Sequence, residues 1–365
     1  ARAAAELHSI SRLWKQSSGL MARSVTQNAG DHGEHYITRD KKEYWAMFYS
    51  AAGGGVLIAL MALFKTYLGS IIDDKVWKGI AEGLNYGLGF MVIFMLHFTV
   101  ATKQPAMTAA RFAEAVEKTP QGKTVNMKLA QLLVDVFRSQ SIAVLGNVLI
   151  AMGLAALIAF GYQYKTGEPL MNADQIAYQL HSIDPFAGTL WFAAIAGVWL
   201  FCSGIISGYF DNRSNYLNMR MRLTQHPLLK KLMSEKSRVK FANYMHENYG
   251  SLIGNLCFGM LLGITGVVGY LTHLPLDIRH VAFSSANVGY IAVSGEFTYS
   301  LLLQCIGFVL LIGLVNLIVS FSLTLWVALR SLNAEIDSWW PIWHEVCQIV
   351  KKRPLSLFLP VQLDK

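Results

Sequence analysis

Charged side chains are scarce in this sequence. Asp, Glu, Lys and Arg together make up only 15% of the 365 residues, whereas hydrophobic residues make up 53%. Soluble domains carry about 25% charged residues, so this deficit excludes an ordinary soluble globular domain. The composition therefore predicts an all-α, polytopic membrane protein.

The cysteine patterns that bind metals or form disulfide frameworks are also missing. The chain has four cysteines, and no two of them have the CxxC spacing of a zinc or redox site. Three of the four lie in apolar stretches; the cysteines are Cys202, Cys257, Cys305 and Cys347. We expect neither a metal nor a cofactor.

The first residues, ARAAAELHSISRLWKQ, contain neither an initiator Met nor the apolar core of a signal peptide. We expect the sequence to be part of a longer protein whose upstream half is one of its partners. Residues 1–44 are then a cytoplasmic segment at the end of that upstream region.

Long apolar stretches dominate the rest of the chain. A helix needs about 20 mostly apolar residues to cross the hydrocarbon core of a bilayer. Lys65 and Glu82 lie near the ends of such stretches, where they reach the interface or face the bundle. The sequence predicts a transmembrane domain at 45–328 and a cytoplasmic amphipathic tail at 329–365. The six expected spans are 46–70, 79–101, 141–163, 189–209, 251–272 and 302–328.

Lys and Arg are distributed unevenly over the segments between these spans. Residues 1–45, 102–140, 210–250 and the tail after 328 hold 26 of them, and the three alternate loops hold four. The positive-inside rule then places both termini and both long loops in the cytoplasm. The net charge of +8 is explained by attraction to anionic lipid of the inner leaflet, so we do not expect nucleic acid as a partner.

The third and fifth expected spans share residues at a constant spacing of 108. Gly146 and Asn147 match Gly254 and Asn255, and each span is followed by a return span that leads into a polar segment. This pattern predicts three helical hairpins repeated in parallel. Small residues at helical spacing also allow close helix packing, which is the simpler explanation of the glycines.

Four polar side chains lie within the expected spans. Unpaired polar groups cost free energy in hydrocarbon, so these side chains either bridge neighbouring helices or line a wet pathway. They are His97, Asn147, Asn255 and Asn316.

Two groups of polar residues follow spans on the expected cytoplasmic side. Lys103 and Gln104 mark the interface after the second span, just before a proline that disfavours a continuous helix. Asp211, Asn212 and Arg213 follow the fourth span, where they are expected to cap and pair at the helix end.

The stretch HLPLDIRHVAFSSANVGY, residues 273–290, lies on the expected outer side. Its polar residues are Asp277, Arg279, His280, Ser284 and Asn287. Residues this polar do not span a membrane, so the segment is expected to form a short interfacial helix or a plug inserted into the bundle. The polar cluster is then either a simple helix cap or a gate or substrate rim at the outer mouth. Catalysis is the least supported alternative, because no second carboxylate, Ser–His–Asp set or metal set accompanies it.

Three unusual stretches resemble one known family. HFTVATKQPAMTAA, SGYFDNR and LPLDIRHVAFSSANVGY are similar to the membrane-embedded C-terminal half of the bacterial proteins labelled Gcr-type site-specific recombinases. The resemblance runs from about Asn28 to the mid-300s. It implies a Gram-negative inner-membrane protein, about twice this length, with a helical N-terminal half.

The residues do not provide the chemistry that the family label names. A tyrosine recombinase uses an Arg/His/Arg cluster, commonly through an HxxR step, and none of the ten histidines has Arg three residues later. A serine recombinase needs a soluble catalytic domain, for which the polar segments are too short. We therefore expect a non-enzymatic membrane protein that binds or moves a small solute or lipid, or that scaffolds an envelope complex or homo-oligomer. DNA recombination at the membrane is the alternative.

Overall fold

The computed structural model describes residues 37–38, 40–101, 104–117, 123–294, 297–332, 336 and 338–360, without the side chains of 104–107, 117 and 123–125. These residues form helices and connecting turns, and no strand is present among them. The helices are α3 (Lys41–Ile71), α4 (Lys75–Met95), α5 (Gln104–Glu117), α6 (Lys123–Thr166), α7 (Ala173–Ile183), α8 (Thr189–Tyr216), α9 (Met219–Gln225), α10 (Pro227–Leu232), α11 (Glu235–Thr272), α12 (Val281–Ile291), α13 (Tyr299–Leu332) and α14 (Trp340–Lys352). Two short 3-10 turns cover Pro185–Ala187 and Pro354–Leu357. The all-α prediction is thus confirmed for the described residues.

Five of these helices are long and apolar enough to cross a membrane: α3, α6 from Asn126, α8, α11 and α13. The second expected span, α4, has 21 residues and is less apolar, because Lys78, Glu82 and Asn85 interrupt it. It also ends at Met95, where the chain turns, and not at residue 101. The predicted extent of this span is therefore wrong at its C-terminal end.

Polar caps fix where several helices begin. Asp40 accepts a hydrogen bond from the backbone N–H of Glu43 at the start of α3. Asp74 accepts from Val76 and Trp77 at the start of α4, so three residues are enough to reverse the chain after α3. Side-chain oxygens satisfy N–H groups that have no partner within the first helical turn.

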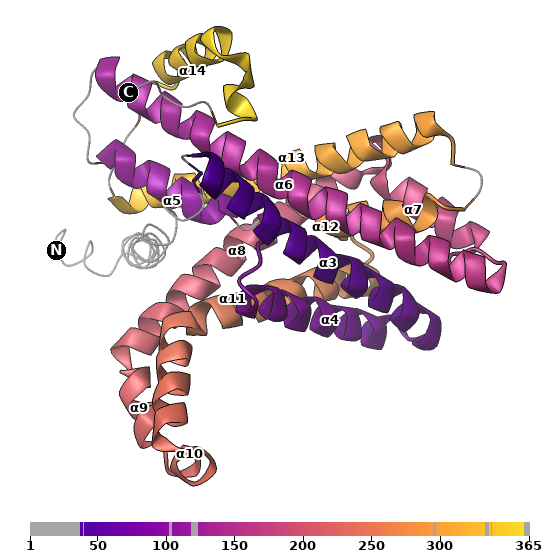
Figure 1. Cartoon of the computed structure of the whole chain (residues 1–365), viewed down its shortest axis with the longest axis horizontal. Helices are drawn as coiled ribbons and strands as arrows, with labels where there is room; N and C mark the ends of the chain where they lie inside the picture. Colours follow the sequence, from indigo (N-terminus) through magenta and orange to yellow (C-terminus); the bar gives the residue numbers. More distant parts are fainter. Residues whose placement is uncertain are drawn as a thin grey trace, which may run out of the picture.

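The long helices form two V-shaped arms and a layer above them (Figure 1). The α3–α4 arm points to one side and the α8–α11 arm points to the other, while α6 and α13 lie above the arms in this view, with α6 alongside α3. The arms meet where α4 packs against α11. A Cβ added to Gly259 would overlap the backbone of Gly87, and one added to Gly263 would overlap that of Gly83. Only glycine permits such a close crossing of the two backbones.

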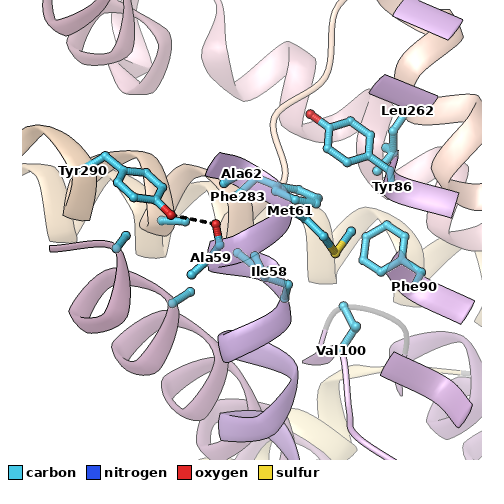
Figure 2. Packing of buried hydrophobic residues seen from close by; sticks show 14 of the residues in the cluster. Ile58, Ala59, Met61, Ala62, Tyr86, Phe90, Val100, Leu262, Phe283 and Tyr290 are labelled. Carbon is cyan, nitrogen blue, oxygen red and sulfur yellow. Dashed lines mark hydrogen bonds between the residues drawn. The ribbon is translucent and has the colours of Figure 1, made fainter. Parts of the chain in front are cut away.

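An apolar core joins the α3–α4 arm to α12. Figure 2 shows Ile58 and Met61 of α3 beside Phe90 of α4, with Phe283 and Tyr290 of α12 on the same cluster. The Tyr290 hydroxyl donates a hydrogen bond of 2.8 Å to the carbonyl of Ala59 in α3. Of the eleven residues of α12, ten are buried. The segment is therefore a helix inserted into the bundle, as the plug alternative predicts.

The helices do not pack as three consecutive hairpins. Among the described residues, α6 packs mainly against α3, α12 and α14, and α13 packs mainly against α5 and α8. Neither the pair α6 and α8 nor the pair α11 and α13 packs extensively. The predicted hairpin arrangement is thus wrong, because glycine positions along a sequence indicate close packing but do not say which helix provides it.

The two ends of the bundle carry different short helices. Phe112 of α5 and Ile342 of α14 pack against Leu129 and Ala130, near the start of α6. At the opposite end, α7 follows α6 and packs against α12 and α13. We call these the α14 end and the α7 end.

Candidate functional site

A pocket of about 440 Å³ lies at the α7 end of the bundle. Its walls come from the C-terminal part of α3, the N-terminal part of α4, α7, and the segment that leads into α12. Five of its lining residues are the polar residues that the sequence places at the outer mouth: Asp277, Arg279, His280, Ser284 and Asn287. The structure therefore brings this predicted group to one cavity, together with residues of three other helices.

Asp277 and Arg279 form an ion pair at the rim. Their closest atoms, Oδ2 and Nη1, are 2.6 Å apart, and the side chains are 38% and 13% exposed. The guanidinium also donates to the carbonyl of Ser182 over 2.8 Å and to that of Ile278 over 2.7 Å. It lies over the ring of Phe192, 5.3 Å from the centroid. Arg279 is therefore held by contacts to α7 and α8 as well as by its carboxylate partner.

His280 lies deeper in the wall than this ion pair. Its side chain is buried, and its ring is 5.7 to 6.1 Å from those of Phe90, Phe258 and Phe283. The imidazole therefore shares the pocket with Asp277 but is packed within the aromatic core.

A second ion pair crosses the pocket from α3 to α4. Lys65 Nζ lies 3.5 Å from a carboxylate oxygen of Glu82, and the side chains are 37% and 14% exposed. The ammonium group is also 5.7 Å from the centroid of the Tyr86 ring. Sequence reasoning noted these two charges separately and missed their pairing. Their opposite signs, each inside an apolar stretch, are the signal that links them.

The α7 side of the pocket was missed altogether, because 164–188 reads as a plain outer loop. Asp174, Gln175 and Tyr178 line the cavity from this helix. The helix begins with a capping box, in which Asn172 and Gln175 exchange side-chain and backbone hydrogen bonds of 2.9 and 3.0 Å. Asn and Gln three residues apart are the sequence signal for such a helix start.

Six charged side chains line the cavity, and they include both signs. Three are basic and three are acidic: Lys65, Lys78, Arg279, Glu82, Asp174 and Asp277. Among the described residues, no group of three His, Cys, Asp or Glu side chains is placed to hold a metal ion. The arrangement suits a small polar ligand with charged groups.

Two of the predicted intramembrane asparagines bridge helices. Asn147 is 1% exposed and forms hydrogen bonds with Ala51 of α3 and with residues 99–101. Asn316 is fully buried and bonds Ala193 of α8 and residues 279–281. Both asparagines therefore act as interhelical contacts.

The other two polar residues lie elsewhere. Asn255 donates to the carbonyl of Ser251, one turn earlier in its own helix. His97 lies at the turn after α4 with φ of 58°, and its carbonyl accepts a hydrogen bond from the Ser50 hydroxyl. Neither residue lines the pocket.

The cytoplasmic-interface residues are only partly described. Lys103 lies outside the described residues, and Gln104 begins α5 with its side chain also outside them. Asp211, Asn212 and Arg213 lie within α8, which continues to Tyr216, so the expected helix end is wrong. Asp211 instead accepts a hydrogen bond of 2.8 Å from the backbone N–H of Gly250 in α11.

Comparison with known proteins gives a match to a protein family. A family model described as site-specific recombinase matches residues 1–360. No curated protein and no solved structure matches the chain. The matched range includes both arms of the bundle, the inserted helix and every residue of the pocket. The chain therefore belongs to the site-specific recombinase family.

Proposed function

We propose that this protein binds a small polar solute in the α7-end pocket and moves it across a membrane. The observation that carries this proposal is the group of six charged residues around a cavity between apolar helices. Charged side chains within membrane helices are costly, so they are placed where they meet water, each other or a ligand. Both signs of charge favour a solute that carries an acidic and a basic group.

A lipid is a poorer fit to this cavity than a polar solute. An acyl chain gains free energy from an apolar wall, whereas Lys65, Glu82, Asp174 and Asp277 surround this space. A purely scaffolding role gives no reason for a cavity lined by charged side chains.

In this proposal α4 also crosses the membrane, which makes six spans in all, and both termini are cytoplasmic. The 26-to-four distribution of Lys and Arg supports the orientation, and it makes the α7 end the outer end. Basic residues of α9 and α10 then face the anionic inner leaflet of a bacterial inner membrane; they are Arg220, Arg222, Lys230 and Lys231. The pocket accordingly opens on the outer side.

Thermal stability in detergent tests the proposal. The full chain is screened against small amines, carboxylates and zwitterions, and a solute that binds the folded state raises the Tm. The variants Glu82→Gln and Asp174→Asn should abolish the shift, while Lys165→Gln, exposed and outside the pocket, should retain it. The proposal is wrong if no solute binds, or if the pocket variants keep the full shift.

DNA recombination is the second candidate, and the description of the matching family favours it. Binding to DNA is dominated by phosphate contacts, so affinity falls steeply as the salt concentration rises. A gel-shift titration of the full chain in detergent at two salt concentrations measures this property. Tight, salt-sensitive binding would favour the second candidate over solute transport.

A further inference from the structure

The hydrogen bonds around Asn147 form a specific pattern. The Asn147 amide nitrogen donates to the carbonyls of Ala51 and Thr99, over 2.5 and 2.9 Å, and its oxygen accepts from the N–H of Ala101 over 2.8 Å. The N–H of Thr99 donates to the carbonyl of Ser50 over 3.1 Å. Thus one asparagine joins the middle of α3 to the chain that leads into α5.

The same pattern occurs around Asn316. Its amide nitrogen donates to the carbonyls of Ala193 and Arg279, over 2.7 and 3.0 Å, and its oxygen accepts from the N–H of Val281 over 3.1 Å. The N–H of Arg279 donates to the carbonyl of Phe192 over 3.2 Å. Here the asparagine joins α8 to the chain that leads into α12, so all four hydrogen bonds have a counterpart.

The spacing along the helices agrees with this correspondence. Ser50 and Ala51 precede Phe192 and Ala193 by 142 residues. At the same spacing, a Cβ on Gly55 would meet the backbone oxygen of Asn147, and one on Gly197 would meet that of Asn316. A chance match of one asparagine does not also place two glycines against equivalent carbonyls.

Whole helices follow the same correspondence, in chain order. The helices α3, α4, α5, α6 and α7 correspond to α8, α11, α12, α13 and α14. The helix α3 packs on α6 as α8 packs on α13, and α12 packs on α6 as α5 packs on α13. The two central helices, α4 and α11, are counterparts and pack on each other, so this contact corresponds to itself.

The two halves run in opposite directions. The helices α3 and α6 run from the α14 end towards the α7 end: Lys65 near the end of α3 lines the pocket, and α7 follows α6. The helices α8 and α13 run the other way, since α8 begins directly after α7 and Ala328 of α13 packs with Phe112 of α5. In a membrane such halves have inverted topology, an arrangement found in many secondary transporters.

The two halves differ in how closely the two helices of their arm pack together. The α3–α4 arm contains the pocket, with Lys65 and Glu82 across it. The α8–α11 arm packs more extensively, and a Cβ on Gly250 or Gly254 would overlap Ser207. Ser207 is the counterpart of Lys65 at the spacing of 142 residues. One arm is therefore open where the other is closed.

We propose that the chain is an inverted repeat that alternates between this state and one in which the arms have exchanged roles. In the second state α3 and α4 close over the pocket, and α8 and α11 separate at the α14 end. The separation exposes a second vestibule lined by Ser203, Ser207, Asp211, Gly250 and Gly254. That this movement carries a solute rests on the proposed solute binding. The conformational exchange itself can be measured without any solute.

Thiol accessibility in intact and permeabilised membranes tests the exchange in the full chain. In a background without native cysteines, Gln175→Cys reports on the pocket and Ser203→Cys on the closed arm. The variant Gly254→Leu places a side chain where Ser207 now packs and so prevents closure of that arm. The population should therefore shift, so that Ser203→Cys reactivity rises at least about threefold and Gln175→Cys reactivity falls by a similar factor.

Gly153→Leu is the matched control, because a Cβ at Gly153 meets nothing and both reactivities should stay unchanged. If Gly254→Leu does not accumulate, Gly250→Ala places one methyl group against Asp211 and is expected to act in the same directions. A rise at Ser203→Cys without a fall at Gln175→Cys would show local loosening only and overturn the proposal.

The two proposals fail separately. Exchange without any solute-dependent Tm shift would leave the inverted repeat standing and refute solute binding. If a solute raises the Tm but the thiol reactivities at Ser203→Cys and Gln175→Cys do not change in opposite directions, solute binding stands and the exchange is refuted.

Discussion

At the scale of single residues, the two bridging asparagines stabilise the irregular parts of the bundle. The turns at 99–101 and 279–281 leave backbone groups without helical partners, and hydrocarbon offers no water to replace them. Asn147 and Asn316 each satisfy one N–H and one carbonyl of this kind, and each also donates to a carbonyl inside a neighbouring long helix. Without them, the helices that follow these turns would begin with unpaired polar groups inside the bundle.

Asn316→Leu should therefore destabilise the protein strongly. The substitution leaves the N–H of Val281 and the carbonyl of Arg279 unpaired, at a cost of about 1–3 kcal/mol for each buried group. The Tm in detergent and the abundance in membranes should both fall. Asn248→Leu is the control, since the Asn248 amide donates to a carbonyl of its own helix, and it should cost far less. Equal losses would contradict the bridging role.

Arg279 and Asp277 should differ in their contribution to stability, although they form one ion pair. Arg279 is 13% exposed and also bonds the carbonyls of Ser182 and Ile278, so Arg279→Ala should cost roughly 2–3 kcal/mol. Asp277→Ala removes a carboxylate that is 38% exposed and leaves the guanidinium bonded to those two carbonyls, so this variant should cost less. Thermal unfolding of both variants measures the difference. A larger loss for Asp277→Ala would contradict this account.

At the scale of elements, the sequence predicted the apolar helices and left insertion of α12 as one of two alternatives, but it did not predict which helices pack together. Apolar length and local polarity are properties of one segment, so they are readable from the chain. The correspondence of the two halves is visible in backbone hydrogen bonds: Thr99 donates to Ser50 in one half, and Arg279 donates to Phe192 in the other. Unlike side chains occupy equivalent places there, which is why residue matching selected Asn255, and not Asn316, as the counterpart of Asn147.

The crossing of α4 and α11 should tolerate no side chain at Gly259. A Cβ at this position overlaps the backbone of Gly87, so Gly259→Val must separate two helices that form the centre of the bundle. We expect loss of folded protein, measured as abundance in the membrane and as monodisperse material in detergent. Gly307→Val is the control, since a Cβ at Gly307 meets nothing, and it should accumulate normally. Normal accumulation of Gly259→Val would contradict the packing.

At the scale of the whole molecule, the α14 and α7 ends should face opposite sides of the membrane. The α14 end carries α5 and α14. The basic helices α9 and α10 connect α8 to α11 on the same side of the bundle. The pocket and α7 lie at the other end, where the connecting segments hold few basic residues. The electrostatic asymmetry thus predicts that the α14 end faces the cytoplasm and that the pocket lies on the outer side.

Single-cysteine labelling in whole cells decides this orientation. Asn172→Cys, at the pocket rim, should react with an impermeant thiol reagent, whereas Ser234→Cys, at the start of α11, should react only after the membrane is permeabilised. The native cysteines are replaced first, so that labelling reports on one position. The reason is physical: a chain with 26 basic residues on one side and four on the other would have to translocate most of its charge to invert. Labelling of Ser234→Cys in intact cells without labelling of Asn172→Cys would invert the topology and place the pocket on the cytoplasmic side.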